Sequence, residues 1–179
     1  RAGKPFFLFG FTFLVWKHFY KALEKTPRRF DCSAGTLIHG GGWKRMEQER
    51  VSREQFHDAL RQVCGLGRIY DYYGMAEQTG SIFVECEQGH FHCSNFSQVF
   101  VRRAADFSLC GAGEEGILQV LSVLPRSYPG HSLLTEDRGV LLGEDDCLCG
   151  RKGRYFSVSG RLPEAELRGC SDVYGSAVG

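Results

Sequence analysis

The sequence predicts an α/β fold of the mixed α+β kind, in which a mixed sheet with helices precedes a mostly β, barrel-like section, either a small barrel or a distorted sheet. Helical signals occur only in the first 64 residues, where they alternate with short apolar runs typical of strands. Beyond residue 65 the chain reads as short β-type runs, most of them separated by Gly and Pro. Hydrophobic residues make up 42% of the 179 residues and aromatic residues 13%. This composition supports a packed core and excludes a disordered chain.

Two strands and one helix are expected before residue 40. The apolar run at 6–9 predicts a buried strand, and the run at 36–39 predicts a second strand that ends in three glycines. Between them we expect a helix over 13–24, which Pro27 stops because proline cannot continue a helix.

The clearest helix signal lies at 52–64. Ser52 and Gln55 have the spacing of a capping box, and Gly65 is a typical helix end. One face of this helix is apolar, at Phe56, Leu60 and Val63. The rest of the chain then predicts six strands, at 68–72, 81–85, 98–102, 116–124, 139–142 and 155–159.

Charge and hydropathy exclude two classes of partner. Lys and Arg number 22 and Asp and Glu 21, so there is no basic footprint for a nucleic acid. The apolar run at 5–16 is shorter than the roughly 20 residues of a membrane helix, and no cleavage site follows it. We therefore expect no membrane insertion and a cytoplasmic protein whose eight cysteines are reduced.

Four segments combine glycine with groups suited to nucleotides. The first is Gly40-Gly41-Gly42 after a strand, where the lack of a Cβ lets backbone lie against a ligand. The second, at 70–78, delivers an aromatic residue, a glycine turn and a carboxylate that could hold Mg²⁺. Alone, the first could be an ordinary tight loop, and the second could be a strand that ends in a turn with a solvated acid.

The other two segments carry an acid, an arginine and a cysteine. Asp137, expected at a strand end, could accept hydrogen bonds from a ribose diol, and its alternative is a surface acidic turn. Arg161 follows a glycine after a strand. Cys170 lies in a glycine-flanked turn where Arg168 favours the nucleophilic thiolate. The alternative for Cys170 is a free thiol in a tail.

Four cysteines have spacing suited to a metal. Cys147 and Cys149 form a C-x-C-G turn, and Cys86 and Cys93 flank two histidines in the stretch 85–94. Zinc prefers four such ligands in a tetrahedron. A structural Zn²⁺ held by these four cysteines is one hypothesis, with His90 or His92 open as a replacement for Cys93. Four unrelated thiols are the equally weighted alternative.

Taken in order, these segments resemble the adenylate-forming superfamily of acyl-activating enzymes. The resemblance is strongest to the acyl-protein synthetases of the bacterial luminescence fatty acid reductase system, with phenylacetate-CoA ligases next. It covers nearly the whole chain and rests on HGGGWK, YGMAEQTGSIF, LPRSYPGHSLLTEDRG, GEDDCLCGRKGRYF and GRLPEAELRGCSD.

The resemblance implies a role for each matching residue. Gly40, Gly41 and Gly42 would line the adenine pocket, and Tyr73, followed by Gly74, would lie against the adenine. Glu77 would hold Mg²⁺, while Asp137, helped by Arg161, would bind the ribose hydroxyls. Cys170 would accept the acyl group. The implied cofactors are ATP and Mg²⁺, to which the cysteine hypothesis adds Zn²⁺.

The sequence departs from the superfamily pattern in several places. Ala76 stands where a threonine is usual, Glu136 replaces the glycine of a T-G-D motif, and the hinge acid after G-R is replaced near Pro163. The phosphate loop and the C-terminal lid are missing, and the chain begins with Arg1. We therefore expect a fragment, with 1–160 the C-terminal part of an adenylation domain and 161–179 a hinge-like segment and tail.

The expected function is that of an enzyme. ATP would activate a fatty acid as an acyl adenylate, and a protein cysteine would take the acyl group for delivery to an acyl reductase. The alternatives are an acyl-CoA ligase of the phenylacetate-CoA ligase type and a non-catalytic, zinc-stapled interaction module.

Overall fold

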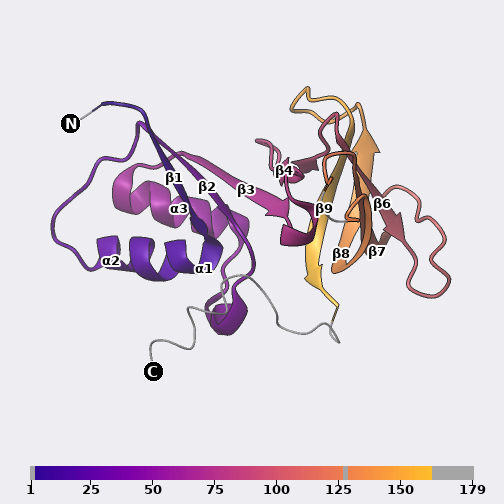
Figure 1. Ribbon diagram of the computed structural model, residues 1–179. Coiled ribbons are helices and arrows are strands. Elements are labelled where there is room, and N and C mark those ends of the chain that lie inside the picture. Colours follow the sequence, from indigo (N-terminus) through magenta and orange to yellow (C-terminus); the bar gives the residue numbers. More distant parts are fainter. Residues whose placement is uncertain (1–2, 127–128, 163–179) are drawn as a thin grey trace. The chain divides into compact units, whose positions relative to one another are not determined.

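The computed structural model describes residues 3–126 and 129–162 and contains two compact units (Figure 1). The N-terminal unit is Arg1–Tyr73 and the C-terminal unit is Gly74–Gly179. Both helices and sheets are present, which confirms the mixed α+β prediction. Among the described residues, no helix is both long and apolar enough to cross a membrane.

Parallel strands and helices build the N-terminal unit. Strands β1 (Phe6–Phe11), β2 (Gly35–Gly40) and β3 (Arg68–Gly74) lie side by side and parallel in that order. A continuous helical run covers 12–24 and consists of α1 (Thr12–Leu14), a π-helical turn (Val15–Tyr20) and α2 (Lys21–Glu24). A 3₁₀ segment (Lys44–Glu49) and α3 (Arg53–Cys64) follow β2. The run 12–24 confirms the predicted helix, which ends before Pro27.

One apolar core joins the helical run 12–24 and helix α3 to the sheet. It includes Val15 and Trp16 of the π-helical turn, Leu37 of β2, and Phe56 and Leu60 of α3. The helices therefore cover the same face of the sheet. The prediction that the strand at 6–9 is buried is wrong, because Phe7 and Phe9 are 60% and 62% exposed. Leu8 packs against the core, so its two neighbours must point to the opposite face of this strand.

Helix α3 begins and ends where its sequence signals predicted. The Ser52 hydroxyl accepts a hydrogen bond from the Gln55 backbone N–H, and the Gln55 side chain accepts one from the Ser52 N–H. Gly65 ends the helix in the left-handed conformation, with φ of 75°. Phe56 and Leu60 are buried as expected, whereas Cys64 is more deeply buried than Val63.

An antiparallel sheet forms most of the C-terminal unit. It has the order β5-β9-β8-β7-β6. The strands of this unit are β4 (Ile82–Val84), β5 (Phe91–His92), β6 (Ser97–Arg102), β7 (Glu115–Ser122), β8 (Ser132–Glu144) and β9 (Arg154–Arg161). The core side chains that are at most 2% exposed include Phe83, Val99, Val101, Leu118, Val120 and Phe156. In the described part of the chain β5 and β6 are edges, so the barrel-like closure is wrong, and the alternative of a distorted sheet fits the register shifts of β8.

Two strands of this sheet differ from the prediction. Strand β8 covers 132–144 and not only 139–142, so Asp137 lies within a strand and not at its end. The pairing of β8 with both β7 and β9 contains register shifts, which accommodate a sequence that lacks regular alternation of apolar and polar residues. Strand β5 contains only two residues and is too short for hydrophobic alternation to reveal it.

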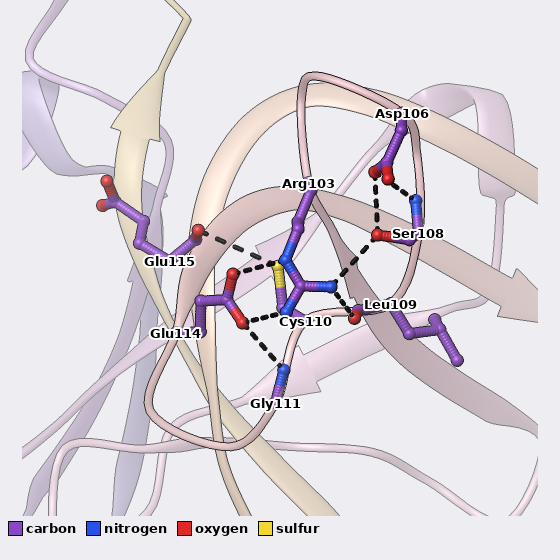
Figure 2. A network of polar contacts seen from close by, with 8 residues as sticks. All are labelled: Arg103, Asp106, Ser108, Leu109, Cys110, Gly111, Glu114 and Glu115. Atoms are coloured by element: carbon purple, nitrogen blue, oxygen red, sulfur yellow. Dashed lines mark hydrogen bonds and ion pairs between the residues drawn. The ribbon is translucent and has the colours of Figure 1, made fainter.

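A network of polar contacts closes the loop between β6 and β7 (Figure 2). The Arg103 guanidinium donates two hydrogen bonds to the Glu114 carboxylate, over 2.7 and 2.5 Å. It also donates to the Ser108 hydroxyl and to the Leu109 carbonyl oxygen. Asp106 accepts hydrogen bonds from the Ser108 backbone N–H and hydroxyl. The planar fork of arginine matches a carboxylate in two places, so this pair orients the loop.

Candidate functional site

Gly40 is required by the sheet itself, whereas Gly41 and Gly42 are exposed. A Cβ on Gly40 would lie 2.5 Å from a ring carbon of Tyr72 and 2.7 Å from its carbonyl oxygen, so only glycine fits where β2 pairs with β3. Gly41 has a φ of +79°, and no atom lies within 4 Å of a Cβ built on Gly42. Of the three predicted adenine-pocket glycines, the last two thus present open backbone after β2.

His39, just before these glycines, is buried and neutral. Its Nδ1 lies 2.9 Å from the Thr12 hydroxyl, and its ring packs on Phe56. Burial first, and then the positive charges of His57 and Arg53, together lower the pKa of His39 from 6.5 to about 3. An imidazole held neutral in this way can accept or donate a hydrogen bond but carries no charge near neutral pH.

The turn after β3 points two neighbouring side chains in opposite directions. Within the 3₁₀ turn Ala76–Gln78, Glu77 is exposed and Gln78 is 1% exposed. The Gln78 amide donates hydrogen bonds to the carbonyl oxygens of Val120 and Gly130, over 3.2 and 2.7 Å. Gln78 therefore anchors the turn that presents the Glu77 carboxylate to solvent. Sequence reasoning assigned Gln78 no role, because nothing in the motif distinguishes an inward amide from a solvated one.

Asp137 and Arg161 come together although 23 residues separate them in the sequence. They face each other across the β8–β9 ladder, and the Arg161 Nε lies 3.7 Å from the Asp137 carboxylate. Arg161 also pairs with Glu136 at 2.5 Å. The resemblance proposed these two residues for one ribose, and the structure places them side by side. Glu136, which replaces the family glycine, shares the arginine with Asp137.

A bulge in β9 produces this alignment. Arg138 pairs with Gly160, but the next residue, Gly139, pairs with Val158, so Ser159 is an extra residue in β9. Gly160 has a φ of +134°, a conformation that side chains rarely adopt. Without the extra residue, Arg161 would not lie opposite Asp137.

Three of the four predicted metal-binding cysteines form a group with a histidine. The ligand atoms of Cys86, His92, Cys147 and Cys149 all lie within 4.8 Å of one another. The sulfur atoms of Cys86 and Cys147 are 4.0 Å apart, and the Cys149 sulfur is 3.3 Å from the His92 Nε2. The seven cysteines among the described residues are all free.

The structure places His92 in this group and leaves out Cys93. Neighbouring residues of an extended segment point to opposite faces, so His92 and Cys93 cannot both point toward Cys149. His90 and His92 lie on the same side, and both stack on the ring of Tyr155. Cys93 is partly buried outside this group, and its loss of contact with water raises the pKa of its thiol to about 12. The alternative of a histidine in place of Cys93 is the one that the geometry supports.

The other predicted residues divide between the two units. Tyr73 is half-buried at the end of the N-terminal unit, and Gly74 opens the C-terminal unit. Cys170, the proposed acyl acceptor, and Pro163 lie outside the described residues.

Comparison with solved structures identifies the fold as that of adenylate-forming ligases. Over 88% of its length this chain matches a long-chain-fatty-acid-CoA ligase from Archaeoglobus fulgidus, with a TM-score of 0.61, 15% identity and 34% of that chain covered. It also matches the luciferase-like enzyme of the nonluminescent mealworm Zophobas morio over 87% of its length, with a TM-score of 0.57, 19% identity and 38% of that chain covered. A third match is ATP-bound MatB from Rhodopseudomonas palustris, with a TM-score of 0.55, 16% identity, and 87% of this chain and 30% of that chain covered. At these identities the likeness establishes the fold alone.

The family follows from the sequence. Residues 1–178 match the family model described as "Acyl-protein synthetase, LuxE", so the chain belongs to this family. It is 24% identical over 141 residues to the long-chain-fatty-acid–luciferin-component ligase of Vibrio harveyi. The aligned stretch covers 75% of this chain and 35% of the relative. This chain therefore spans about a third of the length of that relative. The match confirms the resemblance drawn from the motifs.

Proposed function

We propose that the protein carrying this chain activates a fatty acid with ATP and transfers the acyl group to one of its own cysteines. The family match over residues 1–178 carries this proposal. The name of the Vibrio harveyi relative, a long-chain-fatty-acid–luciferin-component ligase, supports a fatty acid as the substrate.

In the first step, a carboxylate oxygen of the fatty acid attacks the α-phosphorus of ATP. A P–O bond forms, and the bond to pyrophosphate breaks to leave an acyl adenylate. Asp137, partly buried beside Arg161, is suited to accept hydrogen bonds from the ribose hydroxyls. The exposed carboxylate of Glu77 is the kind of oxygen ligand that Mg²⁺ prefers, so Glu77 would hold the ion. The open backbone at Gly41 and Gly42 would face the adenine, and Tyr73 would lie against it.

In the second step, a cysteine thiolate attacks the acyl carbon. A thioester bond forms, and the C–O bond to AMP breaks. We assign this role to Cys170, because Arg168 two residues earlier favours the thiolate. A protein-bound thioester is a suitable substrate for an acyl reductase, and we propose such a partner. A cytoplasmic location remains a prediction.

An acyl-CoA ligase is the second candidate, because solved structures with this fold include a long-chain-fatty-acid-CoA ligase. The two functions differ in the acyl acceptor. Full-length protein is incubated with radiolabelled fatty acid and ATP, with and without CoA, and protein-bound label is released with hydroxylamine. We expect label on the wild-type protein without CoA, and its loss in Cys170→Ser, because a hydroxyl is a far poorer nucleophile than a thiolate.

Cys110→Ser is the matched control, since Cys110 lies in the β6–β7 loop outside the proposed sites and should not affect labelling. Full hydroxylamine-labile label on Cys170→Ser would assign the acceptor to another thiol. Label that accumulates only on CoA would favour the acyl-CoA ligase. A folded protein that forms neither product would support the non-catalytic module.

A further inference from the structure

We propose that Cys86, His92, Cys147 and Cys149 bind one structural Zn²⁺ ion in the C-terminal unit. The ion would join the segment between β4 and β5 to the loop between β8 and β9. This inference does not depend on the proposed acyl transfer.

Two similar turns present the cysteines. Cys86 opens a turn in which the Gly89 backbone N–H donates to the Cys86 carbonyl oxygen, over 2.9 Å. Cys147 opens a second turn, where the Gly150 N–H donates to the Cys147 carbonyl oxygen over the same distance. Gly89 and Gly150 have φ values of 80° and 81°, which glycine adopts without strain. The backbone thus aims Cys86 and Cys147 before any metal arrives.

The distances between ligand atoms fit a tetrahedral ion. Zn–S bonds are about 2.3 Å and Zn–N bonds about 2.0 Å, so tetrahedral ligands lie about 3.5–3.8 Å from one another. The observed pairs bracket this range, at 4.0 Å between Cys86 and Cys147 and at 3.3 Å between Cys149 and His92. All the other pairs lie within 4.8 Å, so shifts of about 1 Å or less would bring the four atoms onto one ion.

The surroundings suit thiolate ligands. The Arg151 backbone N–H donates to the Cys149 sulfur over 3.4 Å, and the His90 Nδ1 lies 3.5 Å from the Cys147 sulfur. Such hydrogen bonds orient ligands and offset charge at zinc sites. Three thiolates and one imidazole leave a net charge of −1 on the complex. The Arg151 side chain, which also pairs with Glu87 over 3.9 Å, lies near enough to offset part of this charge. Tyr155 stacks on His92 and limits the rotation of its ring.

A disulfide explains the cluster less well. Sulfur atoms 4.0 Å apart are far beyond the S–S bond length of about 2.05 Å. A disulfide between any two of these cysteines would also leave the third thiol and His92 in the same group unexplained. Zinc uses all four atoms.

The test measures metal content in full-length protein purified without a metal-affinity tag or chelator. We expect about one zinc per chain by plasma mass spectrometry. Cys149→Ser and His92→Ala should lose most of it, whereas His92→Cys should retain it because a four-cysteine site also suits zinc. Cys93→Ser and Cys110→Ser are matched controls that remove thiols outside the group and should keep the wild-type content.

Cobalt substitution provides a readout that does not depend on the variants folding. Protein refolded with Co²⁺ should show the intense thiolate-to-cobalt absorption and the visible bands of a tetrahedral ion. Two results would overturn the proposal: folded wild-type protein with less than half an equivalent of zinc and no thiolate–cobalt absorption, or Cys93→Ser losing zinc as fully as Cys149→Ser.

Discussion

At the scale of single residues, burial decides which polar side chains are available for chemistry. His39 and Gln78 are buried and hold strands and turns in place, while Gly41, two residues after His39, and Glu77, next to Gln78, are exposed. In both motifs a buried residue that sets the geometry lies within two positions of the residue offered to a ligand. The sequence alone does not distinguish the two, because exposure depends on which residues the rest of the chain packs against them.

His39 should make the protein sensitive to mild acid. Because its pKa falls from 6.5 to about 3 on folding, the unfolded state binds an extra proton between these values. The contribution of His39 to the free energy of unfolding is therefore complete above about pH 6.5. It is lost as the pH falls toward 3, and the free energy of unfolding then decreases by at most about 1.4 kcal/mol per pH unit. Urea unfolding at pH 7 and pH 4.5 measures this loss. His39→Gln removes the titration and should flatten the dependence, whereas the exposed His18→Gln should not. An unchanged dependence in His39→Gln would contradict the assignment.

At the scale of elements, strand register brings distant residues together. Asp137 and Arg161 meet because β8 and β9 pair antiparallel with one extra residue in β9. The family resemblance implied that the two residues lie close together, but the bulge that aligns them could not be predicted, because it leaves no clear mark in the hydrophobic pattern. In contrast, the ends of α3 were predictable, since the capping box at Ser52 and the left-handed Gly65 are local signals.

Gly160→Ala tests the bulge. The alanine Cβ meets no atom within 4 Å, so the cost comes from the backbone, whose φ of +134° is unfavourable for a side chain. We expect a loss of about 1–3 kcal/mol in the free energy of unfolding, measured by urea denaturation, together with weaker ATP binding as Arg161 shifts. Gly111→Ala is the control, because it also has open space and no positive φ. Equal stability of the two variants would show that the bulge tolerates a side chain.

At the scale of the whole molecule, the order of motifs along the chain was more informative than any one of them. The glycine triplet, the turn at Glu77 and the acid at Asp137 each had an ordinary alternative. Together they predicted the family that the match over residues 1–178 confirms. The barrel-like section and the burial of β1 were wrong for a common reason: sheet closure and the covering of a face depend on contacts between distant elements. The choice of His92 over Cys93 likewise required the fold.

Fatty-acid-dependent exchange of radiolabelled pyrophosphate into ATP tests the central claim most directly, because it reports adenylate formation before any acyl transfer. We predict exchange by the full-length wild-type protein that depends on both fatty acid and Mg²⁺. Glu77→Gln should retain the fold and lose about 100-fold or more of the rate, as expected when a charged group at the reacting phosphates is removed. Asp58, an exposed acid on α3, provides a matched control, Asp58→Asn, which should exchange at the wild-type rate. Absence of exchange in the wild-type protein, or a wild-type rate in Glu77→Gln, would contradict the account.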